Sequence, residues 1–130
     1  MIPVILVVED DEDVVPLFKQ MFKKELKNEL FEFVFKLSST EVIDYIKSVP
    51  LGTISLVMSD IKMPDKDGIE LLKDLKRETN IPVFLFSAYD EEINRKAAQL
   101  LAVDQFFTKP IDFTKLREEI FKIIPSKQLK

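Results

Sequence analysis

Five short, mostly apolar runs alternate with five segments of helical periodicity, and this alternation constrains the fold more than any other feature of the chain. The runs lie at residues 2–8, 33–37, 54–58, 83–86 and 104–107. Runs that are apolar on both faces are typical of strands buried in a parallel sheet. The alternation therefore predicts an α/β domain with right-handed crossovers, in which helices cover both faces of a parallel sheet.

The intervening segments carry helix signals. Apolar residues recur at spacings of three and four over residues 14–26, and Pro16 indicates that this helix begins near Val15. Residues 38–41, Ser-Ser-Thr-Glu, fit a capping box that opens the second helix. Three further helices are predicted around residues 69–75, 90–100 and 116–124, the last begun by Asp112 or Thr114.

Composition narrows the chemistry that the chain can perform. Its 130 residues fit one domain, expected over residues 1–124, with a short polar tail at 125–130. There is no cysteine and no histidine, which excludes disulfides, thiolate metal sites and Ser-His-Asp catalysis. The net charge of -4 gives no footprint for nucleic acid, and no apolar run is long enough to span a membrane. The cytoplasm is the expected compartment.

Polar side chains follow the predicted strands where each strand ends. Glu9 and Asp10 end the first strand, Asp60 the third and Ser87 the fourth, and the fifth leads into Lys109. In an open α/β sheet, ligands bind at the carboxyl ends of the strands. We therefore expect three carboxylates, a hydroxyl and an ammonium group to converge at one edge of the sheet.

This set of groups suits phosphoryl transfer. Magnesium is held by carboxylates together with phosphate and water, a lysine attracts phosphoryl oxygens, and a carboxylate can itself become an acyl phosphate. Each residue alone has a plainer explanation: the acids at 9–13 as a solvated loop, and Asp60 as the cap of a turn before Pro64. Those explanations do not account for all of the polar groups following strands at the same edge.

With these residues identified, the chain resembles the receiver domain of two-component response regulators over essentially its whole length. The segments that carry the resemblance are residues 6–13, 59–68, 86–88 and 106–110, and the most specific is Asp-Ile-Lys-Met-Pro-Asp-Lys-Asp-Gly from Asp60. The resemblance implies a flavodoxin-like, doubly wound, five-stranded parallel sheet. Its strand order would be 2-1-3-4-5, with five helices on two faces.

The resemblance also implies roles for the residues at the sheet edge. Asp60 would accept a phosphoryl group from the phosphohistidine of a sensor histidine kinase or a histidine phosphotransfer protein. Mg²⁺ would be held by the Asp60 carboxylate, by Asp10 directly and by the backbone carbonyl of Lys62. Glu9 would contact the ion through a water molecule. Such a domain catalyses its own phosphorylation and slow autodephosphorylation, and is not an enzyme acting on a separate substrate.

Other implied roles concern the response to phosphorylation. Ser87 and Lys109 would contact the phosphoryl oxygens, and the Lys109–Pro110 bond would be cis. Phe106 stands at the position of the family's switch aromatic, which is compatible with ordinary core packing. Phosphorylation would then alter the face made by the fourth helix, fifth strand and fifth helix, which would bind a downstream protein or a second copy of the chain.

The sequence departs from the family pattern in places. Ala102 stands where a glycine commonly follows the fourth helix, and alanine costs about 1 kcal/mol if that position needs positive φ. Ser87 replaces a frequent threonine and keeps the hydroxyl. Lys62 and Tyr89, two residues past Asp60 and Ser87, flank the site and are expected to govern water access.

Tyr89 leads to a first prediction. If its side chain shields an acyl phosphate from water, Tyr89→Ala shortens the dephosphorylation half-life, measured by the decay of phosphorylated protein after the donor is removed. An unchanged half-life would remove Tyr89 from the site.

Two other functions fit the same fold. A receiver-fold interaction module that is never phosphorylated would be expected to lack one of the acidic pair, the aspartate, the hydroxyl or the lysine, and all are present. A phosphatase with an aspartate nucleophile would carry a second acid two residues later, where this chain has Lys62. No effector domain or basic recognition helix follows the last predicted helix. A stand-alone regulator without direct DNA binding, a phosphate relay or a piece of a longer protein are the alternatives left open.

Overall fold

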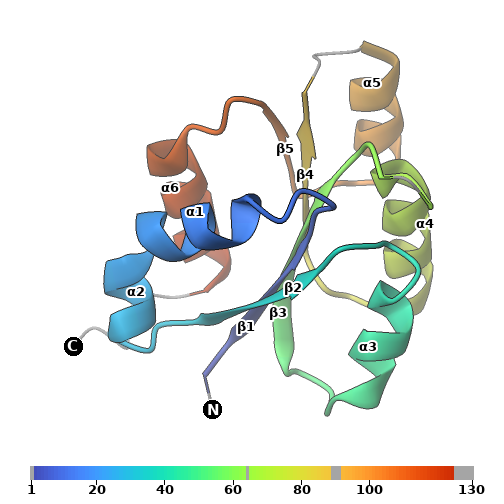
Figure 1. Cartoon of the computed structure of the whole chain (residues 1–130). Helices are drawn as coiled ribbons and strands as arrows, with labels where there is room; N and C mark the ends of the chain where they lie inside the picture. The colour runs from blue at the N-terminus through green and yellow to red at the C-terminus, as the bar shows by residue number, and fades with distance from the viewer. Residues whose placement is uncertain (1, 64, 89–91, 125–130) are drawn as a thin grey trace.

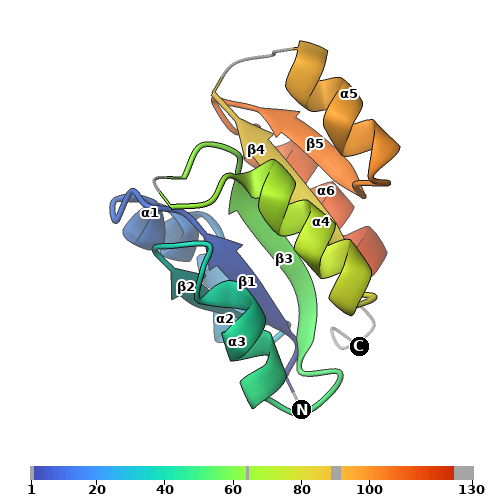
Figure 2. The ribbon, with the colours of Figure 1, turned by 90° about the vertical axis from the view of Figure 1, so that its right-hand side faces the viewer.

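A computed structural model describes residues 2–63, 65–88 and 92–124 of the chain. Its centre is a five-stranded sheet in the order β2-β1-β3-β4-β5, with every neighbouring pair parallel (Figures 1 and 2). The strand order predicted from the resemblance is therefore confirmed. The strands are β1 (Val4–Val8), β2 (Glu32–Lys36), β3 (Ile54–Asp60), β4 (Val83–Ser87) and β5 (Gln105–Thr108).

Helices cover both faces of the sheet. α1 (Val14–Met21), α2 (Lys23–Lys27) and α6 (Phe113–Ile123) lie on one face, and α3 (Val42–Ser48), α4 (Gly68–Glu78) and α5 (Glu92–Leu100) lie on the other (Figures 1 and 2). None of the helices in the described part of the chain is long and apolar enough to cross a membrane. The predicted tail at residues 125–130 lies outside the described residues.

The two layers of the core differ in composition. The layer under α1, α2 and α6 contains ten of the eleven phenylalanines, and all the described ring–ring contacts are found there. The layer under α3, α4 and α5 is mainly aliphatic, and Phe106 is its single phenylalanine. Strand β1 is buried along its whole length and contributes alternate residues to the two layers, as a central strand should.

The number of helices corrects the prediction of five. The segment expected to form one helix from 14 to 26 is divided into α1 and α2 at Phe22, whose φ of -111° and ψ of 24° are not helical. At this break the Arg117 Nη2 donates a hydrogen bond of 2.6 Å to the Met21 carbonyl oxygen. A side chain that inserts into the ladder of helix hydrogen bonds is a common cause of such a kink.

The predicted capping box at residues 38–41 is wrong. The N-cap of α3 is Glu41, which makes no side-chain capping bond, and the Ser38 hydroxyl donates instead to the Glu41 carboxylate (3.1 Å). At the start of α6, by contrast, Asp112 caps as predicted, accepting from the backbone N–H groups of Thr114 (3.0 Å) and Lys115 (3.1 Å). Ala102 has a φ of 57°, so the position does require positive φ and the expected cost of about 1 kcal/mol for alanine applies.

Candidate functional site

The polar groups predicted to converge do so at the carboxyl edge of the sheet. Glu9 directly follows β1, while Asp60 and Ser87 are the last residues of β3 and β4. Carboxylate oxygens of Glu9, Asp10 and Asp60 all lie within 4.8 Å of one another. Their placement follows from the parallel sheet, because the carboxyl ends of neighbouring strands meet at one edge.

Lys109 reaches the same cluster from the other side. Its Nζ lies 3.3 Å from Asp60 Oδ2 and 3.7 Å from Glu9 Oε2. The Lys109 backbone N–H donates to the Ser87 carbonyl (2.8 Å), which fixes the chain just after β5, and the Lys109–Pro110 bond is cis, as the resemblance implied. The Lys109 ammonium group is thus held beside the Asp60 carboxylate, which was predicted from the sequence to be the phosphoryl acceptor.

Gly68 allows the backbone to pass close behind Asp60. The Gly68 N–H donates to the Ile61 carbonyl (2.7 Å), and a Cβ at this position would lie 2.5 Å from the Asp60 carbonyl oxygen. The preceding Asp67 caps α4 by accepting from Glu70 N–H (2.9 Å). Only glycine, which has no Cβ, can lie this close to the Asp60 backbone. Asp67 caps α4 and Gly68 packs against the end of β3, so this Asp-Gly pair holds the loop after β3 in place.

A second contact ties this loop to its neighbour. The Asp65 carboxylate accepts from the backbone N–H groups of Thr40 (2.9 Å) and Ser39 (3.3 Å), and the Ser39 hydroxyl donates to the Lys66 carbonyl (2.5 Å). Desolvation raises the pKa of the Asp65 carboxyl, but backbone donors, Thr40 and Lys66 foremost, outweigh it and lower that pKa to about 2. This contact joins the loops after β2 and β3, and no short-range sequence pattern predicts it.

Glu9 is the carboxyl group most perturbed by its surroundings. Burial raises the pKa of Glu9 from 4.5 to about 7, and the neighbouring Asp60 carboxylate adds to the shift, which the Lys109 ammonium only partly offsets. The residue is 9% exposed. The cluster therefore resists holding its full negative charge when no cation lies among the carboxylates.

This shift predicts a pH dependence for the metal-free protein. The folded protein binds the Glu9 proton more tightly than the unfolded chain does. The stability that it contributes is therefore full below pH 4.5 and is lost as the pH rises through about 7. In buffer containing a chelator, the free energy of unfolding should fall by about 3 kcal/mol over this window relative to Glu9→Gln. Urea denaturation of both proteins at pH 5 and pH 8 measures this difference. The prediction is contradicted if the free energy of unfolding changes by the same amount in wild type and Glu9→Gln.

Three further predicted residues, Ser87, Lys62 and Phe106, lie in β4, just after β3 and in β5. Ser87 is buried, and the Lys62 side chain is exposed. Phe106 is half-buried, with the Arg95 guanidinium 4.5 Å from its ring centroid, and Arg95 also donates to the Thr108 hydroxyl (3.4 Å). Tyr89 lies outside the described residues. Arg95 was not among the predicted site residues, and its contact with Phe106 joins α5 to β5.

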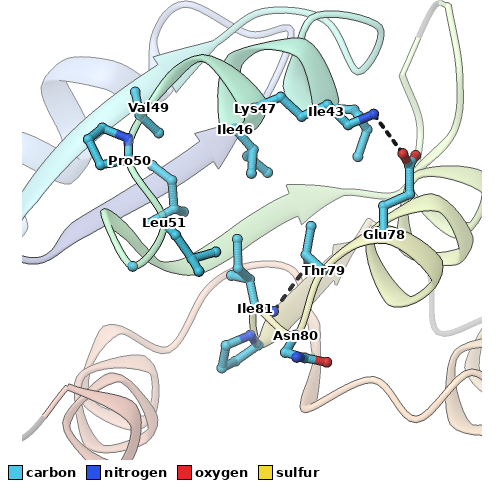
Figure 3. Close-up of a pocket in the computed structure, with 13 residues that line it drawn as sticks. Ile43, Ile46, Lys47, Val49, Pro50, Leu51, Glu78, Thr79, Asn80 and Ile81 are labelled. Carbon is cyan, nitrogen blue, oxygen red and sulfur yellow. Dashed lines mark hydrogen bonds and ion pairs between the residues drawn. The ribbon is translucent and has the colours of Figure 1, made fainter.

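A larger hollow lies at the opposite end of the sheet and has different chemistry. About 680 Å³ in volume, it is lined mainly by aliphatic side chains, among them Ile46, Leu51 and Ile81 (Figure 3). Its one acid, Glu78, is paired with Lys47 at 2.8 Å (Figure 3). The hollow therefore offers no carboxylate cluster, and the candidate site remains at the carboxyl edge of the sheet.

Comparison with known proteins agrees with this geometry. The family model of the response regulator receiver domain matches residues 5–121. The chain belongs to the response regulator receiver domain family. It is therefore a receiver domain of two-component signal transduction, and the resemblance seen in the sequence is confirmed.

Individual relatives show how far this similarity extends. Sporulation initiation phosphotransferase F of Bacillus subtilis is 32% identical over 124 residues, covering 95% of this chain and 94% of that protein. The transcriptional regulatory protein CpxR of Escherichia coli is 28% identical over 92% of the chain, which corresponds to 48% of CpxR. The receiver domain thus spans about half the length of several curated relatives that it matches.

Solved structures confirm the fold. A receiver domain protein from Clostridium thermocellum aligns with a TM-score of 0.82 at 23% identity, covering 98% of both chains. A CheY-like receiver domain protein from Methanospirillum hungatei aligns with a TM-score of 0.80 at 25% identity, covering 99% of this chain and 98% of the other. These likenesses support the doubly wound, flavodoxin-like arrangement described above.

The donor set at the sheet edge fits the metal that the family uses. Receiver domains bind Mg²⁺ in an acidic pocket, and this chain has its acidic cluster at Glu9, Asp10 and Asp60. All three offer hard carboxylate oxygens, the ligands that Mg²⁺ prefers. Burial, and after it the neighbouring Asp60 carboxylate, raise the pKa of Glu9, and a divalent cation bound among these oxygens would favour its charged form.

Proposed function

We propose that this receiver domain accepts a phosphoryl group on Asp60 from the phosphohistidine of a sensor histidine kinase or a histidine phosphotransfer protein. The observation that carries the proposal is the position of the Asp60 carboxylate, which lies beside the Lys109 ammonium group and two further acids, Glu9 and Asp10. Its Oδ2 lies 3.3 Å from Lys109 Nζ, and its carboxylate lies within 4.8 Å of oxygens of Glu9 and Asp10. A purely structural ion pair with Lys109 would gain nothing from two further acids beside it, since like charges repel one another.

The chemistry uses a carboxylate as nucleophile. An Asp60 oxygen forms the new bond to phosphorus while the bond from phosphorus to the histidine nitrogen breaks, and the nitrogen keeps that electron pair. Lys109 attracts one phosphoryl oxygen and the Ser87 hydroxyl donates to another. Asp60 Oδ1 accepts from the Ile61 N–H (3.1 Å), which orients the carboxylate.

Magnesium has a defined place in this proposal. Glu9, Asp10, Asp60 and the Lys62 carbonyl oxygen would hold it, and when bound it neutralises charge that develops on the phosphoryl oxygens. The chain's own contribution is to bring three carboxylates together at a cost that a cation relieves. Burial is the main cause of the raised pKa of Glu9, and the Asp60 carboxylate adds to it.

The response to phosphorylation is proposed to travel through Ser87 and Phe106. Ser87 ends β4, and Phe106 lies in β5 against the aliphatic layer of the core. A new dianionic group on Asp60 shifts a two-state equilibrium if one state brings a hydroxyl closer to it. The face that changes was predicted to consist of the fourth helix, fifth strand and fifth helix, which are α5, β5 and α6 in the structure. This face would bind a downstream protein or a second copy of the chain.

A small phosphoryl donor tests the proposal without a cognate kinase. Incubation with acetyl phosphate and Mg²⁺ should raise the intact mass by one phosphoryl group, and the adduct should be labile to hydroxylamine, as an acyl phosphate is. Chelation or Asp10→Asn should prevent the reaction. A chain that remains unmodified under these conditions would instead be a receiver-fold interaction module, and labelling that persists in chelator would contradict the role of the metal.

A further inference from the structure

Four lysines on one short segment lack the partners that the other cations have. Lys19, Lys23, Lys24 and Lys27 are exposed on α1 and α2, and none forms an ion pair within the described part of the chain. Every other described lysine or arginine interacts with another residue, most often an acid. The described lysines that have no interaction partner are therefore gathered in one place.

Three of these lysines border a shallow groove of about 630 Å³. Lys23, Lys24 and Lys27 line it together with Met21, whose side chain is 38% exposed. A concave surface that joins several ammonium groups to an exposed thioether can receive a segment with both acidic and apolar side chains.

The single acid that lines the groove is already neutralised. Glu25 is buried and accepts a hydrogen bond of 2.7 Å from Arg117 Nε, while the guanidinium lies 4.9 Å from the Phe22 ring centroid. Arg117 also donates to the Met21 carbonyl, so α6 is tied to the end of α1. The floor of the groove is thus fixed and has no net charge, and its walls are positive.

We propose that this groove is a docking site for an acidic segment of a partner protein. Charge complementarity supports that occupant, because the groove is positive in a chain whose net charge is -4. Its concave shape and exposed Met21 favour a peptide segment over the flat, anionic surface of a membrane. Complementary charge of this kind mainly accelerates encounter, and its effect is screened by salt.

The docking site is separate from the chemistry at Asp60. α1 begins at Val14, just beyond Asp10, whereas the groove lies at the far end of α1 and along α2, so no groove residue belongs to the acidic cluster. The proposal therefore holds whether or not Asp60 is phosphorylated, and the two can fail independently.

The test is binding of a short fluorescein-labelled peptide that repeats two glutamates and a leucine, followed by fluorescence anisotropy at low and high salt. Wild-type protein should bind it in a salt-dependent manner, and Lys23→Glu/Lys27→Glu should weaken binding about tenfold. The control is Lys73→Glu/Lys96→Glu, which has the same net charge but reverses exposed lysines on α4 and α5. It should retain the affinity of the wild type.

Three further measurements make the result decisive. Circular dichroism spectra and urea denaturation midpoints should be the same in wild type and both charge-reversed variants, which shows that they fold whether or not Asp60 can be phosphorylated. Lys23→Gln/Lys27→Gln, which adds no negative charge, should bind with intermediate affinity. The proposal is overturned if the peptide does not bind, if both charge-reversed variants lose affinity equally, or if vesicles of phosphatidylserine and phosphatidylcholine bind wild type while the peptide does not.

Discussion

Asp60→Asn is expected to reduce phosphoryl incorporation from acetyl phosphate to background while leaving the fold intact. The amide nearly matches the carboxylate in shape but is not a nucleophile, and it removes the negative charge that both Lys109 and a bound cation would contact. Because Asp60 Oδ1 accepts the Ile61 N–H at 3.1 Å, an asparagine oxygen can keep that hydrogen bond. Intact mass spectrometry measures incorporation, and circular dichroism checks the fold.

Asp11→Asn is the matched control for this substitution. Asp11 lies next to the acidic pair and is exposed, and its carboxylate accepts from the Asp13 N–H at 2.9 Å, a bond that asparagine can also make. It is outside the group of carboxylates that lie within 4.8 Å of one another. Incorporation should continue in this variant, and modification of Asp60→Asn at the wild-type level would place the acceptor elsewhere.

Gly68→Ala is expected to lower both the stability of the fold and the rate of phosphorylation. The added Cβ would stand 2.5 Å from the Asp60 carbonyl oxygen and 2.9 Å from the Ile61 Cα, and both neighbours are backbone atoms that cannot rotate away. Either α4 or the end of β3 must move. Overpacking of this kind costs about 1–3 kcal/mol or more, and the displaced strand end carries the acceptor itself.

The chain's only other glycine provides the control. Gly52 has a φ of 88° and nothing within 4 Å of a Cβ, so Gly52→Ala is penalised by backbone conformation alone, at about 1 kcal/mol. It is at the opposite end of β3, beside the apolar hollow, and should not alter labelling. Urea denaturation and the rate of labelling separate the two variants. If Gly68→Ala unfolds no more easily than Gly52→Ala and is labelled at the wild-type rate, the close approach is not a constraint.

The parts of the fold that depend on short-range pattern could be predicted from the sequence. Alternating apolar runs located all five strands. Asp112 was one of the two starts predicted for the last helix, because an N-cap acts within three residues. The carboxyl-edge cluster followed from the same pattern, because a parallel sheet fixes which end of each strand faces the site. Glu9, Asp60 and Lys109 are therefore together as expected.

Features that depend on contacts between distant segments could not be predicted in this way. The break at Phe22 coincides with a hydrogen bond from Arg117, which is 96 residues from Met21 in the chain. The capping box was wrong because α3 begins only after Glu41, and the preceding loop is held by Asp65, which lies 25 residues past Thr40. Nor could the sequence give the pKa of Glu9, which depends on burial and on the Asp60 carboxylate nearby.

The uneven distribution of phenylalanine between the two layers has a practical consequence for spectroscopy. The chain contains no tryptophan, so intrinsic fluorescence is a poor monitor of its conformation. Biosynthetic labelling with fluorophenylalanine would place ten fluorine nuclei in the layer under α1, α2 and α6, and one, at Phe106, in the other. Fluorine NMR of this chain would thus separate the two layers. The lone resonance of the aliphatic layer reports on Phe106, the proposed switch residue, and the other ten report on the layer that includes Phe107 of β5 and Phe113 and Phe121 of α6.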